Sequence, residues 1–157
     1  MMDYGEKIRN LTIAAMNVRG GYPPSTIQPD GVIVLKGDEK LYFKISGVYL
    51  YEGQSFTINR NIDIRAGKGS AKAERMGAAL DTGSLYLTDK RIVFAGINKA
   101  ATIPLEYVTY SVHYNDGILI RGDRWTIPIL AINTVAEPVY WDIFNAILES
   151  LVRRIKE

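Results

Sequence analysis

The residue types that could carry out nucleophilic or acid–base chemistry are few in this chain of 157 residues. Its single histidine, His113, lies close to Ser111 and Asp116, and serine, histidine and aspartate are the types that form a hydrolytic triad. Such a triad also needs a sharp turn that exposes the nucleophile and N–H groups that stabilise the oxyanion. The sequence contains no motif for either. We therefore predict that the protein is not an enzyme.

Metal, redox and nucleotide chemistry find little support in the composition. The chain has no cysteine and one histidine, which excludes disulfides, thiolate nucleophiles, cysteine metal sites and multi-histidine metal sites. Gly67 and Gly69 lie in a glycine-containing stretch that lacks the Gly-Lys-Ser/Thr ending of a phosphate-binding P-loop. We expect neither a metal nor a cofactor.

A group of basic residues between positions 60 and 75 could bind an anion. Its members are Arg60, Arg65, Lys68, Lys72 and Arg75. Nearby glycines would let backbone N–H groups approach a phosphate or an acidic partner. Asp63 and Glu74 offset part of this charge, and the alternative interpretation is a solvated loop with ordinary surface charge.

The overall charge and the hydropathy limit the classes of partner. A net charge of +2, from 19 basic and 17 acidic side chains, is too balanced for a dedicated nucleic-acid surface. No apolar run approaches the roughly 20 residues that cross a bilayer, and the first residues do not resemble a signal peptide. We therefore expect a cytoplasmic protein. The tripeptide Arg121-Gly122-Asp123 is interpreted as a tight turn rather than as an adhesion motif.

The N-terminal segment, residues 1–20, predicts a helix from Asp3 to Val18. Its apolar residues recur every three or four positions and so share a face: Tyr4, Ile8, Leu11, Ala15 and Val18. This helix would either pack on the rest of the chain or bind a partner. Residues 21–30 contain three prolines and predict a semi-rigid linker that separates the helix from a main domain at 31–157.

A hairpin is predicted at residues 82–96, where two apolar runs flank the charged residues 89–91. A two-residue loop pairs Thr88 with Arg91, Leu87 with Ile92, Tyr86 with Val93 and Leu85 with Phe94. This register places Leu85, Leu87, Ile92 and Phe94 on one face. The charged residues are then expected to form a solvated hairpin tip.

The period of two continues through most of the domain. Strands are predicted at 40–51 with a bulge at Gly47, and at 100–112 with a bend at Pro104. Residues 55–65 predict either one long strand or two strands broken near Asn59-Arg60. Residues 66–80 predict a loop with a short helical turn at 71–76. Two turns, at 115–117 and at 122–123, predict further hairpins, the second pairing Arg121 with Arg124.

The chain ends in a predicted amphipathic helix with a wide apolar face. Its residues are Tyr140, Ile143, Phe144, Ile147, Leu148, Leu151 and Ile155. Thr134 and Glu137 have the spacing of a capping box, and Pro138 suits a first helical turn. Such a helix can cover the apolar interior of about seven antiparallel strands. The predicted fold is therefore mainly β, a seven-stranded antiparallel sandwich or partly open barrel closed by the C-terminal helix.

The hairpin and the order of elements resemble the pleckstrin-homology-like superfamily. Residues 83–94 (GSLYLTDKRIVF) are similar to the G-x-L-x-L-T-x-x-R-hydrophobic-x-F hairpin of GRAM-type members. The likeness continues through Ile103-Pro104-Leu105, Asp116-Gly117-Ile118 and Pro138, covers about residues 31–155, and is closest to prokaryotic members. The resemblance implies a curled antiparallel sandwich plugged by a helix, and a non-catalytic module that binds anionic lipid headgroups, peptides or proteins.

Two binding functions follow from this resemblance. Lipid-binding members tend to carry basic residues in the loop after the first strand, whereas the corresponding loop here, residues 51–54, has an acid and no base. The first hypothesis is therefore protein–protein interaction or self-assembly, with an unidentified protein or a second copy as partner. The alternative is binding of an anionic membrane surface or ligand through the 60–75 cluster.

Overall fold

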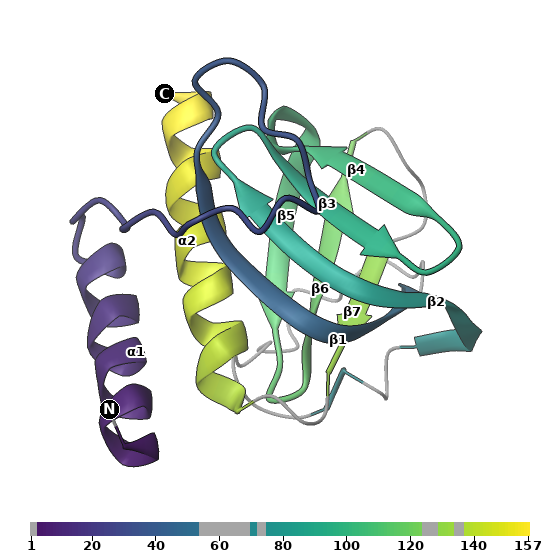
Figure 1. Cartoon of the computed structure of the whole chain (residues 1–157), viewed down its shortest axis with the longest axis horizontal. Coiled ribbons are helices and arrows are strands. Elements are labelled where there is room, and N and C mark those ends of the chain that lie inside the picture. The colour runs from purple at the N-terminus through teal and green to yellow at the C-terminus, as the bar shows by residue number, and fades with distance from the viewer. Residues whose placement is uncertain (1–2, 54–69, 72–74, 124–128, 134–136) are drawn as a thin grey trace, which may run out of the picture.

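The computed structural model describes residues 3–53, 70–71, 75–123, 129–133 and 137–157. The elements are α1 (Tyr4–Arg19), β1 (Leu41–Gly53), β2 (Arg75–Thr88), β3 (Arg91–Gly96), β4 (Ala100–Pro104), the 3-10 helix η2 (Leu105–Tyr107), β5 (Val108–His113), β6 (Gly117–Gly122), β7 (Ile129–Ile132) and α2 (Pro138–Lys156) (Figure 1). The predicted mainly β fold, with seven antiparallel strands and a helix toward each end, is confirmed. No described helix is long and apolar enough to cross a bilayer.

The described strands form one open sheet in the order β4-β3-β2-β1-β7-β6-β5. The first four strands are a meander, and the last three return to β1 on its other side. The prediction of a single strand at 100–112 bent at Pro104 is wrong. β4 ends at Pro104, and the 3-10 turn leads to β5 at the opposite end of the sheet. Proline cannot donate to a strand ladder, which makes it a suitable end for this edge strand.

The long strand β1 bends at Gly47, as predicted. Gly47 has a φ of 66°, and the pairing with β2 shifts register between Ile45 and Val48. Before the bulge β1 pairs with β2 alone, whereas from Tyr49 onward it also pairs with β7. The Asn133 side-chain amide donates to the carbonyl of Ser46 and so secures the bulge. The bulge lets one strand serve both halves of the sheet.

The hairpin β2–β3 has the predicted register. Leu85 pairs with Phe94, Tyr86 with Val93 and Leu87 with Ile92, around the two-residue loop at 89–90. The face predicted to be apolar is part of the main core. There it belongs to the same cluster as Ile118 and Ile120 of β6 and Trp141 and Leu148 of α2. Tyr86 and Val93 on the other face are also buried, because Ile33 and Leu35 cover them. The hairpin is therefore covered on both faces.

At Gly83 the backbones of β2 and β3 approach too closely for a side chain. A Cβ atom there would lie 2.0 Å from the carbonyl oxygen of Ala95 and 2.6 Å from the Cα of Gly96. We predict that Gly83→Ala lowers the free energy of unfolding by about 1–3 kcal/mol, because paired backbones must move apart. Urea denaturation will measure this loss. Gly5→Ala is the matched control, because its added Cβ would meet only the Asp3 carboxylate, at 3.6 Å. A Gly83→Ala variant whose free energy of unfolding equals that of the wild type would contradict this close approach.

Helix α2 supplies the core that the sheet encloses. Trp141, Phe144 and Leu148 are completely buried, and the ring of Phe43 meets that of Phe144 edge-on at 6.3 Å between centroids. The predicted helix and the place of Pro138 in its first turn are confirmed. The predicted capping box is wrong, because Glu137 is itself the N-cap residue and makes no side-chain capping bond. Thr134 lies outside the described residues.

Two further sequence predictions need correction. The turn at 122–123 does not pair Arg121 with Arg124. Instead β6 and β7 pair Gly117 with Ile132 and Ile120 with Ile129, so that the connection is longer than a tight turn. Residues 75–80 belong to β2 and not to a loop or helical turn. The strand predicted at 55–65 lies outside the described residues.

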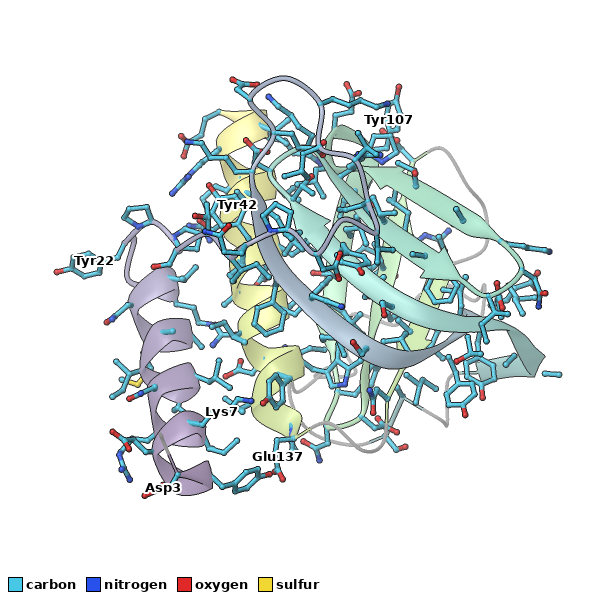
Figure 2. All side chains as sticks on the ribbon, viewed as in Figure 1. Asp3, Lys7, Tyr22, Tyr42, Tyr107 and Glu137 are labelled. Atoms are coloured by element: carbon cyan, nitrogen blue, oxygen red, sulfur yellow. The ribbon has the colours of Figure 1, made fainter. Side chains whose placement is uncertain are left out.

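Helix α1 forms where it was predicted and packs on α2. The Asp3 carboxylate caps it by accepting the Glu6 N–H at 2.7 Å. Ala15 and Val18 are buried, whereas the Tyr4 ring, predicted to share that face, is 61% exposed. Figure 1 shows α1 on the outer side of α2, and Figure 2 shows Lys7 reaching from α1 toward α2, where its ammonium lies 5.7 Å from the ring centre of Tyr140.

The proline-containing linker lies against the sheet rather than apart from it. The Ile27 N–H donates to the carbonyl of Leu41, and the Asp30 carboxylate accepts from Lys44 Nζ at 2.5 Å and from the Tyr86 hydroxyl at 2.7 Å. The hydrogen bond from Lys44, together with those from the Val32 N–H and Tyr86, lowers the pKa of Asp30. These contacts attach the linker to β1 and β2.

Candidate functional site

The basic cluster predicted from the sequence falls mostly outside the described residues. Arg60, Arg65, Lys68 and Lys72 lie there, and of Arg75 only the backbone at the start of β2 is described. Within the stretch 60–75, the described residues Ser70 and Ala71 donate to the Asp116 carboxylate, from the Ser70 hydroxyl at 2.8 Å and from the Ala71 N–H at 2.5 Å. Anion binding at 60–75 therefore stays a prediction.

The charged hairpin tip was predicted to be solvated, and this prediction is wrong for Arg91. Arg91 donates to the Glu39 carboxylate from Nε at 2.9 Å and from Nη2 at 3.2 Å, and also to the carbonyl of Val34. The Glu39 side chain is only 2% exposed, and the Thr88 hydroxyl donates to it at 2.6 Å. Burial alone would raise the pKa of Glu39, but the hydrogen bonds from Arg91, Thr88 and the Lys36 N–H lower it. Of the three charged residues, only Lys90 is exposed, and Asp89 and Arg91 are half-buried.

The structure does not assemble a triad around His113. The Ser111 hydroxyl donates to the Asn145 side chain at 2.5 Å, and the Asp116 carboxylate is bonded to Ser70 and Ala71. Neither Ser111 nor Asp116 is hydrogen-bonded to His113 in the part of the chain that the structure describes. The nucleophile–base contact that this chemistry requires is thus missing among these residues.

His113 belongs instead to a polar network between β5 and α2. The Asn145 side-chain nitrogen contacts both His113 Nδ1 and a Glu149 carboxylate oxygen, each at 3.2 Å. Because a carboxylate only accepts, this nitrogen must be a donor, so His113 accepts at Nδ1 and carries its proton on Nε2. That Nε2 lies 3.5 Å from Asp142 Oδ1. Burial is the main cause that lowers the pKa of His113, so the ring is neutral at pH 7.

This network lines an open polar pocket of about 380 Å³. Its walls are Arg19, Ser111, Val112, His113, Asp142, Asn145 and Glu149. Arg19, from the last turn of α1, donates to the Asp142 carboxylate at 2.6 Å and closes one side. Three elements that are far apart in the sequence therefore meet here.

A second cleft, of about 270 Å³, continues along the same strand and helix. It is lined by Val108, Thr109, Tyr110, Ser111, Leu148, Glu149, Val152 and Arg153. Ser111 and Glu149 line both hollows, so the polar pocket and this cleft are two parts of one groove between β5 and α2. We call it the β5–α2 groove. Its strand side is β5, which is an end strand of the described sheet.

Sequence reasoning did not predict this groove. Asp142, Asn145 and Glu149 are spaced by three and four residues and therefore share one face of α2. Asn145, at 3% exposed, interrupts an otherwise apolar run, and a buried amide in such a run was the available signal. The sequence could not show that β5, rather than another strand, would lie opposite this face.

Comparisons with known proteins do not assign a family. No protein-family model matches the chain, and no curated protein is significantly similar to it. The function is therefore argued from the geometry of the β5–α2 groove.

Proposed function

We propose that the protein is a non-catalytic, cytoplasmic binding module of pleckstrin-homology-like type that mediates protein–protein interaction, and that it binds its partner in the β5–α2 groove. The observation that carries this proposal is an end strand lying beside an open groove. An extended segment of a partner can add to such an edge through main-chain hydrogen bonds, while its side chains enter the groove.

The walls of the groove suit a peptide segment. On the helix side, the half-buried Val152 gives the partner a small apolar surface above the fully buried Leu148. On the strand side, Thr109 is exposed and Ser111 is half-buried. The Lys156 ammonium donates to the carbonyl of Val108 at 2.7 Å, so this carbonyl at the start of β5 already has a partner. Affinity would come from the backbone, and specificity from alternate side chains.

The strand order and the helix that closes the sheet support the resemblance to pleckstrin-homology-like domains. The resemblance rests on the hairpin at 83–94 and on the order of elements, and it favours binding over catalysis. A second copy of the chain is one candidate partner, because the edge of β5 can also pair with a neighbouring molecule. Light scattering over a range of concentrations will separate self-association from binding to a different protein.

We predict that peptides selected from a random display library bind along β5, and that Val152→Trp, which fills the groove, weakens their binding at least about tenfold. Amide NMR shifts upon titration should concentrate in 109–112 and in the facing turns of α2. The end strand β4 is the internal control, and Ile155→Trp, at an exposed position on the same helix, is the matched variant. Binding that shifts β4 instead, or that survives Val152→Trp, would refute this assignment.

The anionic-ligand alternative is tested separately. Flotation with anionic liposomes at low salt, where electrostatic attraction is strongest, should capture the protein if the 60–75 cluster binds lipid. Because Val152→Trp changes no charged residue, it should leave any such electrostatic flotation unchanged.

A further inference from the structure

The polar end of the β5–α2 groove differs in charge from the rest of it. The pocket walls contain one cation, Arg19, and two carboxylates, Asp142 and Glu149, with His113 neutral. Glu149 lines both parts of the groove, so the remainder adds only one charged side chain, the cation Arg153. The excess negative charge therefore lies at the polar end.

The buried side-chain amide of Asn145 orients the Glu149 carboxylate at this end of the groove. The Asn145 side-chain oxygen accepts a hydrogen bond from the Ser111 hydroxyl, and its nitrogen donates to one Glu149 oxygen. The carboxylate is therefore oriented by a side chain that is itself fixed. Glu149 is exposed and makes no ion pair with any residue among those the structure describes. An oriented carboxylate of this kind is a good acceptor for an ammonium or a guanidinium group.

The same pocket already holds one guanidinium. Arg19 approaches Asp142 from α1, with Nη2 2.6 Å from the carboxylate and 3.3 Å from the backbone carbonyl of that residue. Asp142 and Glu149 are seven residues apart, two turns of α2. Arg19 thus neutralises one carboxylate, whereas the second, Glu149, faces the groove and makes no ion pair with Arg153 or any other described residue.

We propose that the polar end of the β5–α2 groove is a specificity pocket for a lysine or arginine side chain of the bound segment, with Glu149 as its main acceptor. This inference rests on the proposed function. A strand added to β5 turns every second side chain to the same side, so only one position of the segment reaches the pocket. Asn145 acts as a positioning residue for Glu149, and Ser111 positions Asn145.

The test begins with peptides selected against the wild-type protein. A basic residue should recur at one position, and synthetic versions with lysine, glutamine or glutamate there should be titrated by fluorescence anisotropy. We expect lysine to bind about fivefold more tightly than glutamine, as for a solvent-accessible ion pair, and glutamate to bind more weakly than either. In Glu149→Gln the lysine-to-glutamine ratio should fall to near one, and in Glu149→Lys the order should reverse.

The control is Glu52→Gln, which removes an exposed carboxylate at the far end of β1, outside the groove, and should leave the ratio unchanged. Circular dichroism will confirm that each variant is folded. Selected peptides that show no basic position, or a lysine preference that persists in Glu149→Gln, would overturn the specificity pocket and leave the groove intact. If no library peptide binds along β5, the proposed function itself is refuted, and the specificity pocket is refuted with it.

Discussion

Replacing Arg91 with methionine is expected to lower the free energy of unfolding by about 3–5 kcal/mol, because it leaves a buried carboxylate without its cation. The Glu39 side chain is 2% exposed and that of Arg91 17% exposed. Arg91 also donates to the carbonyl of Val34, so its loss releases the segment that covers the outer face of β2 and β3. Chemical denaturation at pH 7 will measure the change.

Two variants make this result specific. Lys90→Met, at the exposed neighbouring position of the same tip, should change stability by no more than about 0.5 kcal/mol. Adding Glu39→Met to Arg91→Met should recover part of the loss, because an apolar pair carries no uncompensated charge. A cost for Arg91→Met as small as that of Lys90→Met would show that the ion pair contributes little.

The pH dependence gives an independent readout. The pKa of Glu39 lies below its ordinary value of 4.5 in the folded protein, so its contribution to stability is complete above pH 4.5 and is lost as the pH falls through the lower, folded-state value. Without Arg91 this pKa rises, and less stability is lost on acidification. The difference between wild type and Arg91→Met should therefore shrink below pH 4.5. A difference that is constant with pH would contradict this account.

The ion pair shows where sequence reasoning stops. The alternation of apolar residues fixed the register of β2 and β3, because a shift by one residue would turn the apolar set to the wrong face. Glu39 and Arg91, however, are 52 residues apart. The periodicity of each segment shows which residues share a face and does not show which distant segment covers it. The tip was therefore predicted to be solvated.

The same limit applies to the turn after β6 and to the groove. A glycine followed by an aspartate at 122–123 suggested a tight turn, and alternation was equally consistent with a register shifted by four residues. The structure adopts the shifted register, in which the buried residues 118 and 120 face 131 and 129. Likewise, the apolar stripe of α2 was evident, but the strand order that brings β5 beside Asn145 depends on connections across the whole sheet.

Replacing Phe144 with alanine is expected to destabilise the protein by about 3–5 kcal/mol, because the loss of a fully buried ring leaves a cavity as well as lost apolar contact. Phe144 packs edge-on against both Phe43 of β1 and Trp141 of α2, so its loss loosens the contact that fixes the helix on the sheet. The measurement is denaturation by guanidinium, with Ile155→Ala, at a position 43% exposed on the same helix, as the matched control.

The Phe144 variant also tests how the groove depends on the core. Because α2 is one wall of the groove and Phe144 faces away from it into the core, binding should weaken only as far as the helix becomes mobile. We therefore expect Phe144→Ala to lose peptide affinity on warming, well before the wild type does, while Val152→Trp loses it at every temperature. A Phe144→Ala variant that is as stable as Ile155→Ala would mean that α2 does not hold the core as the structure has it.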